Sequence, residues 1–221
     1  MCGRFAVTLP SDAMAQLFAA SPANDLPQGP NYNICPTNSV HVVTSEGDGR
    51  QLVSFRWGFL PHWYKTPSDG PLLINARAET IAEKPAFKSA ARARRCLIPA
   101  TGFYEWTKDE AGNRLPWYIT PTDGEVLAFA GVWQGWDKGD APLKTCAIVT
   151  TGANTTMSAI HHRMPVILRQ EDWALWLGEA GHGAATLMRA APEDALQFWR
   201  VDRAVNSNKA QGADLILPID G

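Results

Sequence analysis

Short apolar runs separated by turn-forming residues dominate the middle of the chain, and this pattern is typical of β-strands rather than of long amphipathic helices. The runs 40–44 and 51–57 flank a Glu-Gly-Asp-Gly stretch that suits a tight turn, so they predict a strand pair. Further strands are predicted at 96–99, 102–106, 117–120, 126–133, 144–150 and 166–168.

Other segments have the spacing of short helices. Ser11 precedes an Ala/Met/Leu/Phe run and is a candidate N-cap for a helix over 11–20. Thr80 and Glu83 have the spacing of a capping box, which predicts a helix from Thr80 to about Arg94. Two later helices are predicted at 171–177 and 192–198, and the Pro-, Asn- and Gly-rich stretches 21–36 and 58–71 predict loops.

This order of elements indicates an α+β fold, with a mostly antiparallel, barrel-like sheet and flanking short helices. The chain has 221 residues, no internal repeat and no long linker, so residues 1–221 are predicted to form a single domain. Sixteen prolines argue against a helical bundle.

Composition narrows the class of protein. Apolar residues make up 45% and charged residues 19%, which is typical of a globular chain, and the net charge of −2 disfavours a surface that binds polyanions throughout. The apolar run 126–133 is far shorter than a membrane span, and the N-terminus lacks a secretion-signal pattern. We expect a cytoplasmic protein with no membrane partner.

Cysteine and histidine spacing gives no sign of a metal site or of a bound cofactor. The four cysteines are separated by dozens of residues, and among the histidines only His161 and His162 adjoin. In a reducing compartment the cysteines are expected to be free thiols.

Cys2 is the most informative single residue. Removal of Met1 would leave Cys2 with both a free α-amine, with a pKa of roughly 7.7–8.0, and a thiol, with a pKa of about 8.5. Such a 1,2-aminothiol condenses with an aldehyde to an imine, and the thiol then closes a thiazolidine ring. A cysteine at the second position by accident is the competing interpretation.

Three further clusters supply polar chemistry. Asn75 and Arg77 stand two apart at the end of an apolar run, so in an extended segment they share a face; a turn with a surface arginine is the alternative. Glu105 lies among aromatic residues, where a carboxyl group has a raised pKa, although a solvent-facing edge position is common for a lone Glu. His161 is a candidate acid or base, while His162 is expected to lack a partner.

Charge and aromatic residues add a candidate surface for nucleic acid. Residues 77–95 carry six basic against two acidic side chains, a surplus of four, which suits either a phosphate backbone or a solvated helix face. Trp63 and Trp106 are candidates for stacking on unpaired bases, whereas most of the nine tryptophans are expected in the core.

The order of five motifs resembles one family. Met1–Phe5, Asn75–Glu79, Gly102–Trp106, Ile160–Pro165 and Arg203–Asn206 occur as in the SRAP ("SOS response-associated peptidase") family, and the resemblance extends from residue 2 to about residue 218. It implies a barrel-like domain that senses abasic sites in single-stranded DNA and crosslinks to them covalently during the DNA damage (SOS) response. This activity predicts one adduct per chain without multiple turnover, and association with the nucleoid when the protein is bound to DNA. The sequence has no heptad pattern and no obvious apolar interface, so a monomer is expected.

The resemblance also implies roles for individual residues. Cys2 is the nucleophile, Asn75 positions Cys2 or the sugar, and Glu105 and His161 transfer protons. The phosphate-holding and base-stacking positions correspond to Arg4, Arg77, Arg163, Trp63 and Trp106. The peptidase activity in the family name is interpreted as removal of the residue or segment that precedes the cysteine, and here only Met1 precedes it.

Three positions depart from the family pattern. His162 stands where Asp is frequent, Cys35 where Ala is common, and Tyr64 where many relatives carry a second Trp. Because of His162, the choice of His161 as the single catalytic histidine is less clear. Cys35 could form an adventitious disulfide with Cys2, and Tyr64 could weaken the aromatic surface that stacks against bases.

Two other functions use the same residues. An N-terminal-nucleophile amidohydrolase or thiol protease would attack a carbonyl with the Cys2 thiolate and would turn over on amides. A single-strand-binding module without catalysis would keep its whole function after Cys2→Ala. The aminothiol and the resemblance together favour aldehyde capture.

Overall fold

Five strands close into a barrel in the computed structural model, which describes residues 2–23, 25–47 and 49–219. Within those ranges, each barrel strand pairs with two neighbours in the order β4, β5, β11, β10, β7 and back to β4. Only the β5–β11 pair of this ring is parallel. The strand bounds are β4 Ser39–Glu46, β5 Gly49–Trp57, β7 Arg95–Ala100, β10 Leu127–Trp136 and β11 Leu143–Gly152.

Short strands extend the barrel at its rim. Strand β2 (Ala20–Pro22) pairs with β5, while β6 (Asn75–Arg77) and β12 (Arg163–Pro165) both pair with β11. Strand β11 therefore contacts four other strands: β5, β6, β10 and β12.

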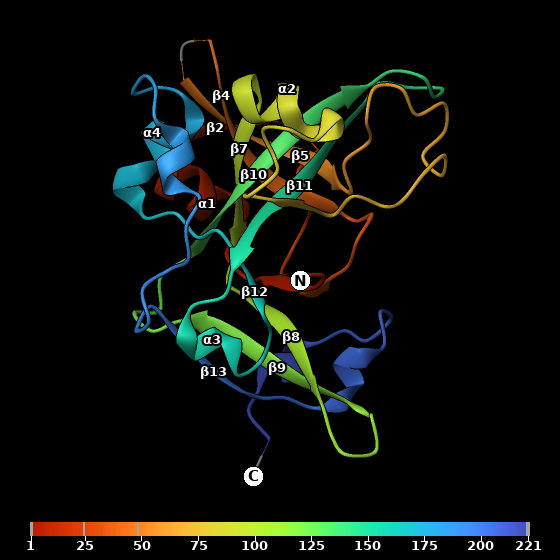
Figure 1. Ribbon diagram of the computed structural model, residues 1–221, viewed down its shortest axis with the longest axis vertical. Coiled ribbons are helices and arrows are strands. Elements are labelled where there is room, and N and C mark those ends of the chain that lie inside the picture. Colours follow the sequence, from red (N-terminus) through yellow and green to blue (C-terminus); the bar gives the residue numbers. More distant parts are fainter. Residues whose placement is uncertain (1, 24, 48, 220–221) are drawn as a thin grey trace.

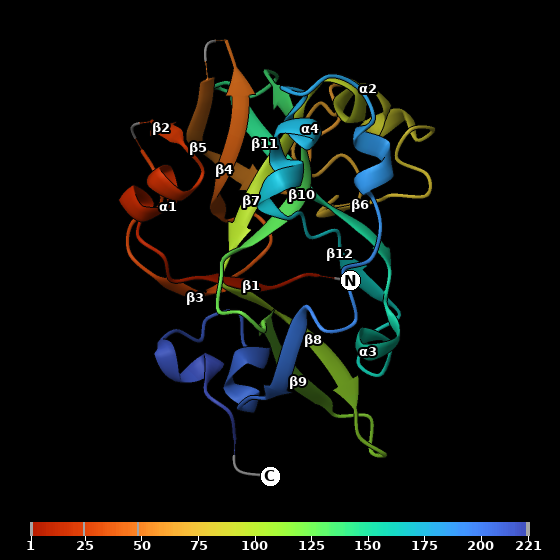
Figure 2. The ribbon, with the colours of Figure 1, turned by 90° about the vertical axis from the view of Figure 1, so that its left-hand side faces the viewer.

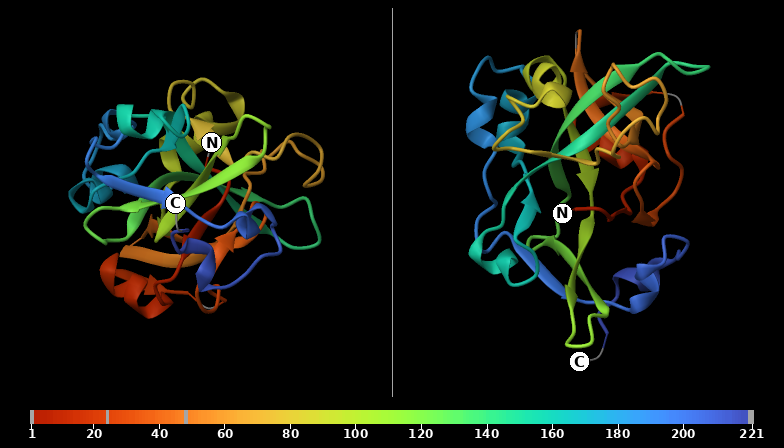
Figure 3. Two further views of the ribbon diagram at one scale, coloured as in Figure 1. Left: turned by 90° about the horizontal axis from the view of Figure 1, so that it is seen from below. Right: turned by 45° about the vertical axis from the view of Figure 1, so that its right-hand side comes forward.

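A second, antiparallel sheet lies beside the barrel, below it in Figure 1. Its strand order is β13-β9-β8-β1-β3. The bounds are β1 Phe5–Val7, β3 Asn31–Ile34, β8 Gly102–Lys108, β9 Arg114–Pro121 and β13 Leu196–Arg200. The N-terminal segment runs between the barrel and this sheet (Figure 2 and the right-hand view of Figure 3).

The helices are short and lie at the periphery (Figure 1). The α-helices are α1 Ser11–Leu17, α2 Pro85–Ala93, α3 Thr155–Ser158 and α4 Trp173–Leu177. The 3₁₀ helices are η1 Gln170–Asp172, η2 Ala184–Leu187, η3 Arg203–Asn206 and η4 Ala213–Ile216. Among the described residues, no helix is both long enough and apolar enough to span a membrane.

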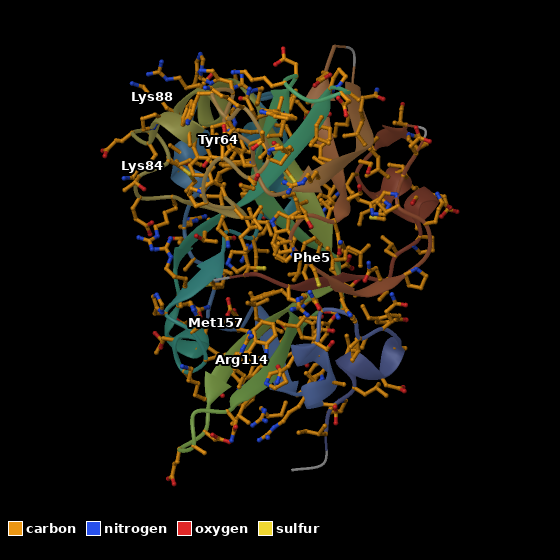
Figure 4. The ribbon with its side chains drawn as sticks, turned by 90° about the vertical axis from the view of Figure 1, so that its right-hand side faces the viewer. Phe5, Tyr64, Lys84, Lys88, Arg114 and Met157 are labelled. Carbon is orange, nitrogen blue, oxygen red and sulfur yellow. The ribbon has the colours of Figure 1, made fainter. Side chains whose placement is uncertain are left out.

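Phe5 joins the barrel to the second sheet. Its side chain is fully buried and contacts Trp57 and Phe129 of the barrel edge-on, with ring centroids 5.0 and 6.0 Å apart. Its backbone pairs with Phe103 of β8, in the second sheet. Figure 4 labels Phe5 at the level where the two sheets meet. The apolar residue that follows the N-terminal segment thus fixes that segment between them.

The α+β class and the largely antiparallel barrel are confirmed, and so is the strand pair over 40–44 and 51–57, which lies within β4 and β5. The first predicted helix is shorter than expected. It ends at Leu17, and Ser11 does not cap it, because the Ser11 Oγ lies 2.9 Å from Nε2 of the buried His41 instead.

The predicted capping box over 80–83 is wrong. Residues 78–83 form turns, and helix α2 begins at Pro85, after Lys84 in an extended conformation. A proline at the first helical position has its φ preset for the helix, while it disfavours the α-conformation of the residue before it. The start signal was therefore Pro85 rather than Thr80.

Three other segments differ because long-range pairing decided their structure. The predicted helix at 192–198 is wrong, since Leu196–Arg200 forms β13 and pairs with β9 along its whole length. The predicted loop 21–36 contains the ends of β2 and all of β3. The predicted strand at 166–168 lies instead at 163–165, and only an isolated bridge follows at Ile167.

Replacement of Phe5 by Ala should destabilise the protein by about 3–5 kcal/mol, because the buried ring would leave a cavity between the two sheets. Urea unfolding would measure this loss. Leu217→Ala is the control, because Leu217 is 53% exposed and its truncation should cost less than about 1 kcal/mol. Equal effects of the two substitutions would contradict the role given to Phe5.

Candidate functional site

Cys2 lies three residues before the start of β1, and its side chain is fully buried. The Asn75 side chain contacts Cys2, although the two residues are 73 positions apart in the sequence: Asn75 Nδ2 donates to the Cys2 carbonyl oxygen at 3.0 Å. Asn75 is held there by β6, which pairs in parallel with β11 and places Asn75 opposite Ile148. Asn75 Oδ1 is buried and has no hydrogen-bond partner among the described residues. The amide is thus anchored by its nitrogen and keeps an acceptor beside Cys2.

Glu105 comes to the same place from β8. The antiparallel pairs Phe5–Phe103 and Ala6–Gly102, continued along the strands, place Glu105 opposite Gly3 and next to Cys2. The carboxylate is 3% exposed, and burial raises its pKa. Burial also raises the pKa of the Cys2 thiol far above its ordinary value, and the negative charge of Glu105 raises it further. The two groups therefore interact electrostatically.

His161 follows helix α3, and its ring is tied to the backbone of Arg163. The Arg163 amide donates to His161 Nδ1 at 3.0 Å, and the Arg163 carbonyl oxygen lies 3.2 Å from the same nitrogen. The backbone amide of His161 donates to the Met157 carbonyl, which closes the turn after α3. Burial lowers the pKa of His161 to about 4, so the ring is neutral at pH 7.

The Arg163 side chain points to an internal partner. Its guanidinium forms a two-pronged ion pair with Glu79, with N–O distances of 2.7 and 3.0 Å, and it also donates to the Thr150 carbonyl oxygen at 2.7 Å. Hydrogen bonding from Arg163 lowers the pKa of Glu79. This arginine is thus already matched with a carboxylate.

Arg4 is also engaged inside the protein. It donates to Asn33 Oδ1 at 2.6 Å and to the Val205 carbonyl oxygen at 3.0 Å. Asn33 in turn donates to the carbonyl oxygens of Ser207 and Ala210. These bonds fasten the late segment around η3, which contains one of the family-like motifs, to β1 and β3.

The other three expected DNA-contacting residues differ in exposure. Arg77 is exposed at the end of β6, two residues from Asn75. Trp63 is 43% exposed on the loop after β5. Trp106 is half-buried, because its Nε1 donates to Asn206 Oδ1 at 2.6 Å and the Arg114 guanidinium lies 4.5 Å from its ring centroid. Arg77 and Trp63 therefore offer open side chains, whereas Trp106 is partly committed to its neighbours.

The basic stretch 77–95 does not form one continuous surface. Arg94 and Arg95 use their guanidinium groups on carbonyl oxygens of Trp133 and Trp176, respectively. Figure 4 shows Lys84, just before helix α2, and Lys88, on that helix, in the upper part of the molecule, at the other end from Arg114. Only Arg77 of this stretch belongs to the segment that carries Asn75.

The positions that depart from the family pattern are also accounted for. His162 is exposed but has a partner, contrary to expectation, because its ring stacks on His161 with centroids 4.4 Å apart. Cys35 is a free thiol near the Asn33 carbonyl and forms no disulfide with Cys2. Tyr64 is 8% exposed, so it lies inside the loop while its neighbour Trp63 lies outside.

Sequence reasoning missed several residues that shape the site. Glu79 stands in the quoted motif Asn75–Glu79, and its spacing gave no reason to pair it with Arg163, which is 84 residues away. Asn33 lies in the predicted loop 21–36, and Arg114 carried no sequence signal. Among the described residues, no group of three or more His, Cys, Asp or Glu side chains is placed to hold a metal ion.

The profile of the SOS response associated peptidase (SRAP) family matches residues 1–208. The chain belongs to the SRAP family. It is 35% identical over 223 residues to the abasic site processing protein YoqW of Bacillus subtilis, with 98% of this chain and 99% of the relative covered. It is 32% identical over 228 residues to the abasic site processing protein YedK of Escherichia coli, with 99% and 100% covered.

The fold is shared with a solved structure. A crystal structure of a protein from Bacteroides thetaiotaomicron superposes with a TM-score of 0.86 at 24% identity, covering 99% of this chain and 100% of that one. At this level of identity the match establishes the fold alone. The SRAP chain therefore has relatives in sequence and in architecture along almost its whole length.

The lowered pKa of His161 predicts a pH dependence of stability. The unfolded chain binds a proton on this residue below about pH 6.5, whereas the folded protein binds it only near pH 4. His161 therefore opposes folding increasingly as the pH falls from 6.5 towards 4. Urea unfolding between pH 7 and pH 4.5 should show a shallower loss of stability in His161→Gln than in the wild type. Parallel curves would contradict the burial of a neutral ring.

Proposed function

We propose that this SRAP protein captures abasic sites in single-stranded DNA as a covalent thiazolidine on Cys2. The observation that carries the proposal is the convergence on Cys2 of Asn75 from β6 and Glu105 from β8. The family membership and the names of the relatives YoqW and YedK support an abasic site as the target.

The chemistry begins after Met1 has been removed, a step that concerns a residue outside the described ranges. The free α-amine of Cys2 adds to the C1′ aldehyde of a ring-opened abasic deoxyribose, and loss of one water gives an imine. The Cys2 sulfur then adds to the imine carbon, and its proton goes to the nitrogen. The sum is aldehyde plus aminothiol giving thiazolidine plus water, with no oxidant or reductant.

Buried acid–base groups suit these steps. The Cys2 thiol is protonated at neutral pH, because burial raises its pKa, so its proton must be taken up as the sulfur adds. Glu105 interacts with that thiol. Burial moves the pKa of Glu105 towards neutral pH, and a group whose pKa lies nearer the working pH both accepts and donates protons more readily. Asn75 Oδ1 is a buried acceptor for an N–H or O–H group of the intermediates.

The DNA strand is proposed to lie near the exposed side chains of Arg77 and Trp63. Arg77 carries a phosphate-binding guanidinium two residues from Asn75, and Trp63 offers an open ring for base stacking. Trp106 presents a partly covered face, and contact of Arg4 or Arg163 with phosphate requires an exchange of the partners that each holds now.

The competing function is an N-terminal-nucleophile amidohydrolase or peptidase. The same Cys2 and Glu105 would serve, but hydrolysis by a thiolate requires a thiol that ionises near neutral pH. Burial and the charge of Glu105 both raise the pKa of the Cys2 thiol. Aldehyde capture begins at the amine and is less affected by this rise, so the electrostatics favour it.

Intact-protein mass spectrometry with an oligonucleotide that contains one abasic site tests the proposal. A Met1-free sample should gain the mass of one oligonucleotide less one water. Cys2→Ala should give no stable adduct, while Cys35→Ala, which alters a second free thiol, should react as the wild type does. An intact oligonucleotide is the substrate control.

The opposite outcome is equally informative. No adduct from a folded, Met1-free sample would overturn the proposal, and turnover of amide substrates by the same sample would establish the hydrolase. Retention of all DNA binding and all cellular function in Cys2→Ala would identify a binding module without catalysis.

Replacement of Asn75 should slow crosslinking by about tenfold or more, because the carbonyl of Cys2 would lose the donor that fixes it. Asn75→Ala and Asn75→Asp both remove this donor, and the Asp variant keeps the size of the side chain. Binding to intact single strands, measured by fluorescence anisotropy, should change less than twofold. A parallel loss of binding and crosslinking would make Asn75 a structural residue instead.

A further inference from the structure

We infer that Glu79 is a positioning residue for His161, acting through Arg163. The inference rests on the proposed function and on the proton-transfer role that the family resemblance implies for His161. The carrying observation is a continuous chain of contacts from the Glu79 carboxylate to the Arg163 guanidinium and from the Arg163 backbone to the His161 ring.

The first contact is a bidentate ion pair between Glu79 and Arg163. Both carboxylate oxygens of Glu79 accept from the two terminal nitrogens of Arg163, at 2.7 and 3.0 Å. The Arg163 side chain is 13% exposed and the Glu79 side chain 50% exposed, so the guanidinium is shielded from water while the carboxylate stays partly open to it. A planar guanidinium held by two parallel bonds has little rotational freedom.

Strand β11 supplies the second set of contacts. Arg163 Nη2 donates to the Thr150 carbonyl oxygen at 2.7 Å, and the backbone of Arg163 pairs with Gly152 across the β11–β12 ladder. The Gly152 backbone also forms a hydrogen bond with Glu79, which helps to lower the pKa of that carboxyl group. Glu79 thus bonds both to Gly152 at the end of β11 and to Arg163 at the start of β12. His161 lies two residues before Arg163, so Glu79 holds the end of the ladder that is nearest to His161.

The third contact determines the state of the imidazole. In the neutral ring, Nδ1 accepts from the Arg163 amide at 3.0 Å, so the proton resides on Nε2. In the protonated ring, Nδ1–H has the Arg163 carbonyl oxygen within 3.2 Å. Because Nδ1 is engaged with one residue in either state, proton exchange with a substrate falls to Nε2.

Glu79 therefore affects the reaction without touching the substrate. If its carboxylate is lost, the Arg163 side chain no longer holds the end of β12 against Thr150, and the backbone groups that face Nδ1 become free to move. The neutral imidazole then populates both tautomers instead of one. The consequence is a slower reaction rather than a weaker affinity for DNA.

Glu79→Gln tests this directly, because it keeps the shape of the side chain but removes its charge. Long-range proton–nitrogen NMR spectra of the imidazole should show His161 with its proton on Nε2 in the wild type at pH 7, and a mixture of tautomers in Glu79→Gln. Crosslinking to an abasic oligonucleotide should be about tenfold slower in the variant.

Glu179→Gln is the matched control. Glu179 forms the same kind of two-pronged ion pair, with Arg50, at N–O distances of 3.0 and 2.8 Å, but it contacts no residue of the site among those described. This variant should leave both the tautomer and the crosslinking rate unchanged. A single Nε2 tautomer in Glu79→Gln, or an equal disturbance in both variants, would overturn the inference.

Arg163→Lys separates this role from phosphate binding. Lysine keeps the positive charge for a phosphate but cannot form the bidentate ion pair. It should therefore reproduce the tautomer mixture and the slower crosslinking of Glu79→Gln, while affinity for intact single strands stays within about twofold. If Arg163→Lys shows the wild-type His161 tautomer and the wild-type crosslinking rate, the positioning role of the Glu79–Arg163 pair is refuted. The NMR measurement needs no DNA, so it stands or falls independently of the proposed function.

Discussion

The site depends on strand β11 and on the way its two ends are used. One end completes the barrel by pairing in parallel with β5 at Thr145 and Cys146. The other end holds β6 on one side, at Ile148–Thr150, and β12 on the other, at Thr150–Gly152. Because β6 carries Asn75 and β12 begins at Arg163, one strand sets the distance between the two halves of the site. The second sheet contributes Glu105 from β8, and its strand β1 is anchored to the barrel through Phe5.

Burial is what makes this arrangement chemically distinctive. Desolvation moves the pKa values of Cys2 and Glu105 upward and that of His161 downward, so all three favour their uncharged forms. A buried thiol that stays protonated disfavours thiolate chemistry, and it suits a reaction in which a neutral amine adds to the aldehyde carbon and the thiol then adds to the imine carbon. The covalent capture proposed above therefore agrees with the electrostatics as well as with the family.

Local sequence was sufficient to predict a strand where the strand with which it pairs is adjacent in the sequence. The β4–β5 pair was predictable because its turn residues and both apolar runs lie within one stretch of sequence. Strand β13 was not, because its structure comes from pairing with β9, about 80 residues earlier, and an isolated reading of 192–198 favours a helix. The early segment β3 is likewise defined by β1 and by the late residues around Ala210.

The same distinction applies to the site. Cys2, Asn75 and Glu105 could be named as candidates because each residue type in its local setting suggests chemistry, and the fold places these three candidates close together. Arg163 was also identifiable, but its partner Glu79 was not, because nothing local to either residue indicates the 84-residue contact between them.

This distinction changes what an arginine in a family motif implies. A guanidinium that already holds a carboxylate with two bonds would have to give up that partner to bind a phosphate, and the exchange returns little net energy because the two anions offer similar geometry. Arg4, bound to an amide and a carbonyl oxygen, has neutral partners and loses less in such an exchange. Arg77 is exposed and loses least. The three arginines therefore form a graded series, in which Arg77 is the most available for a new anionic partner and Arg163 the least.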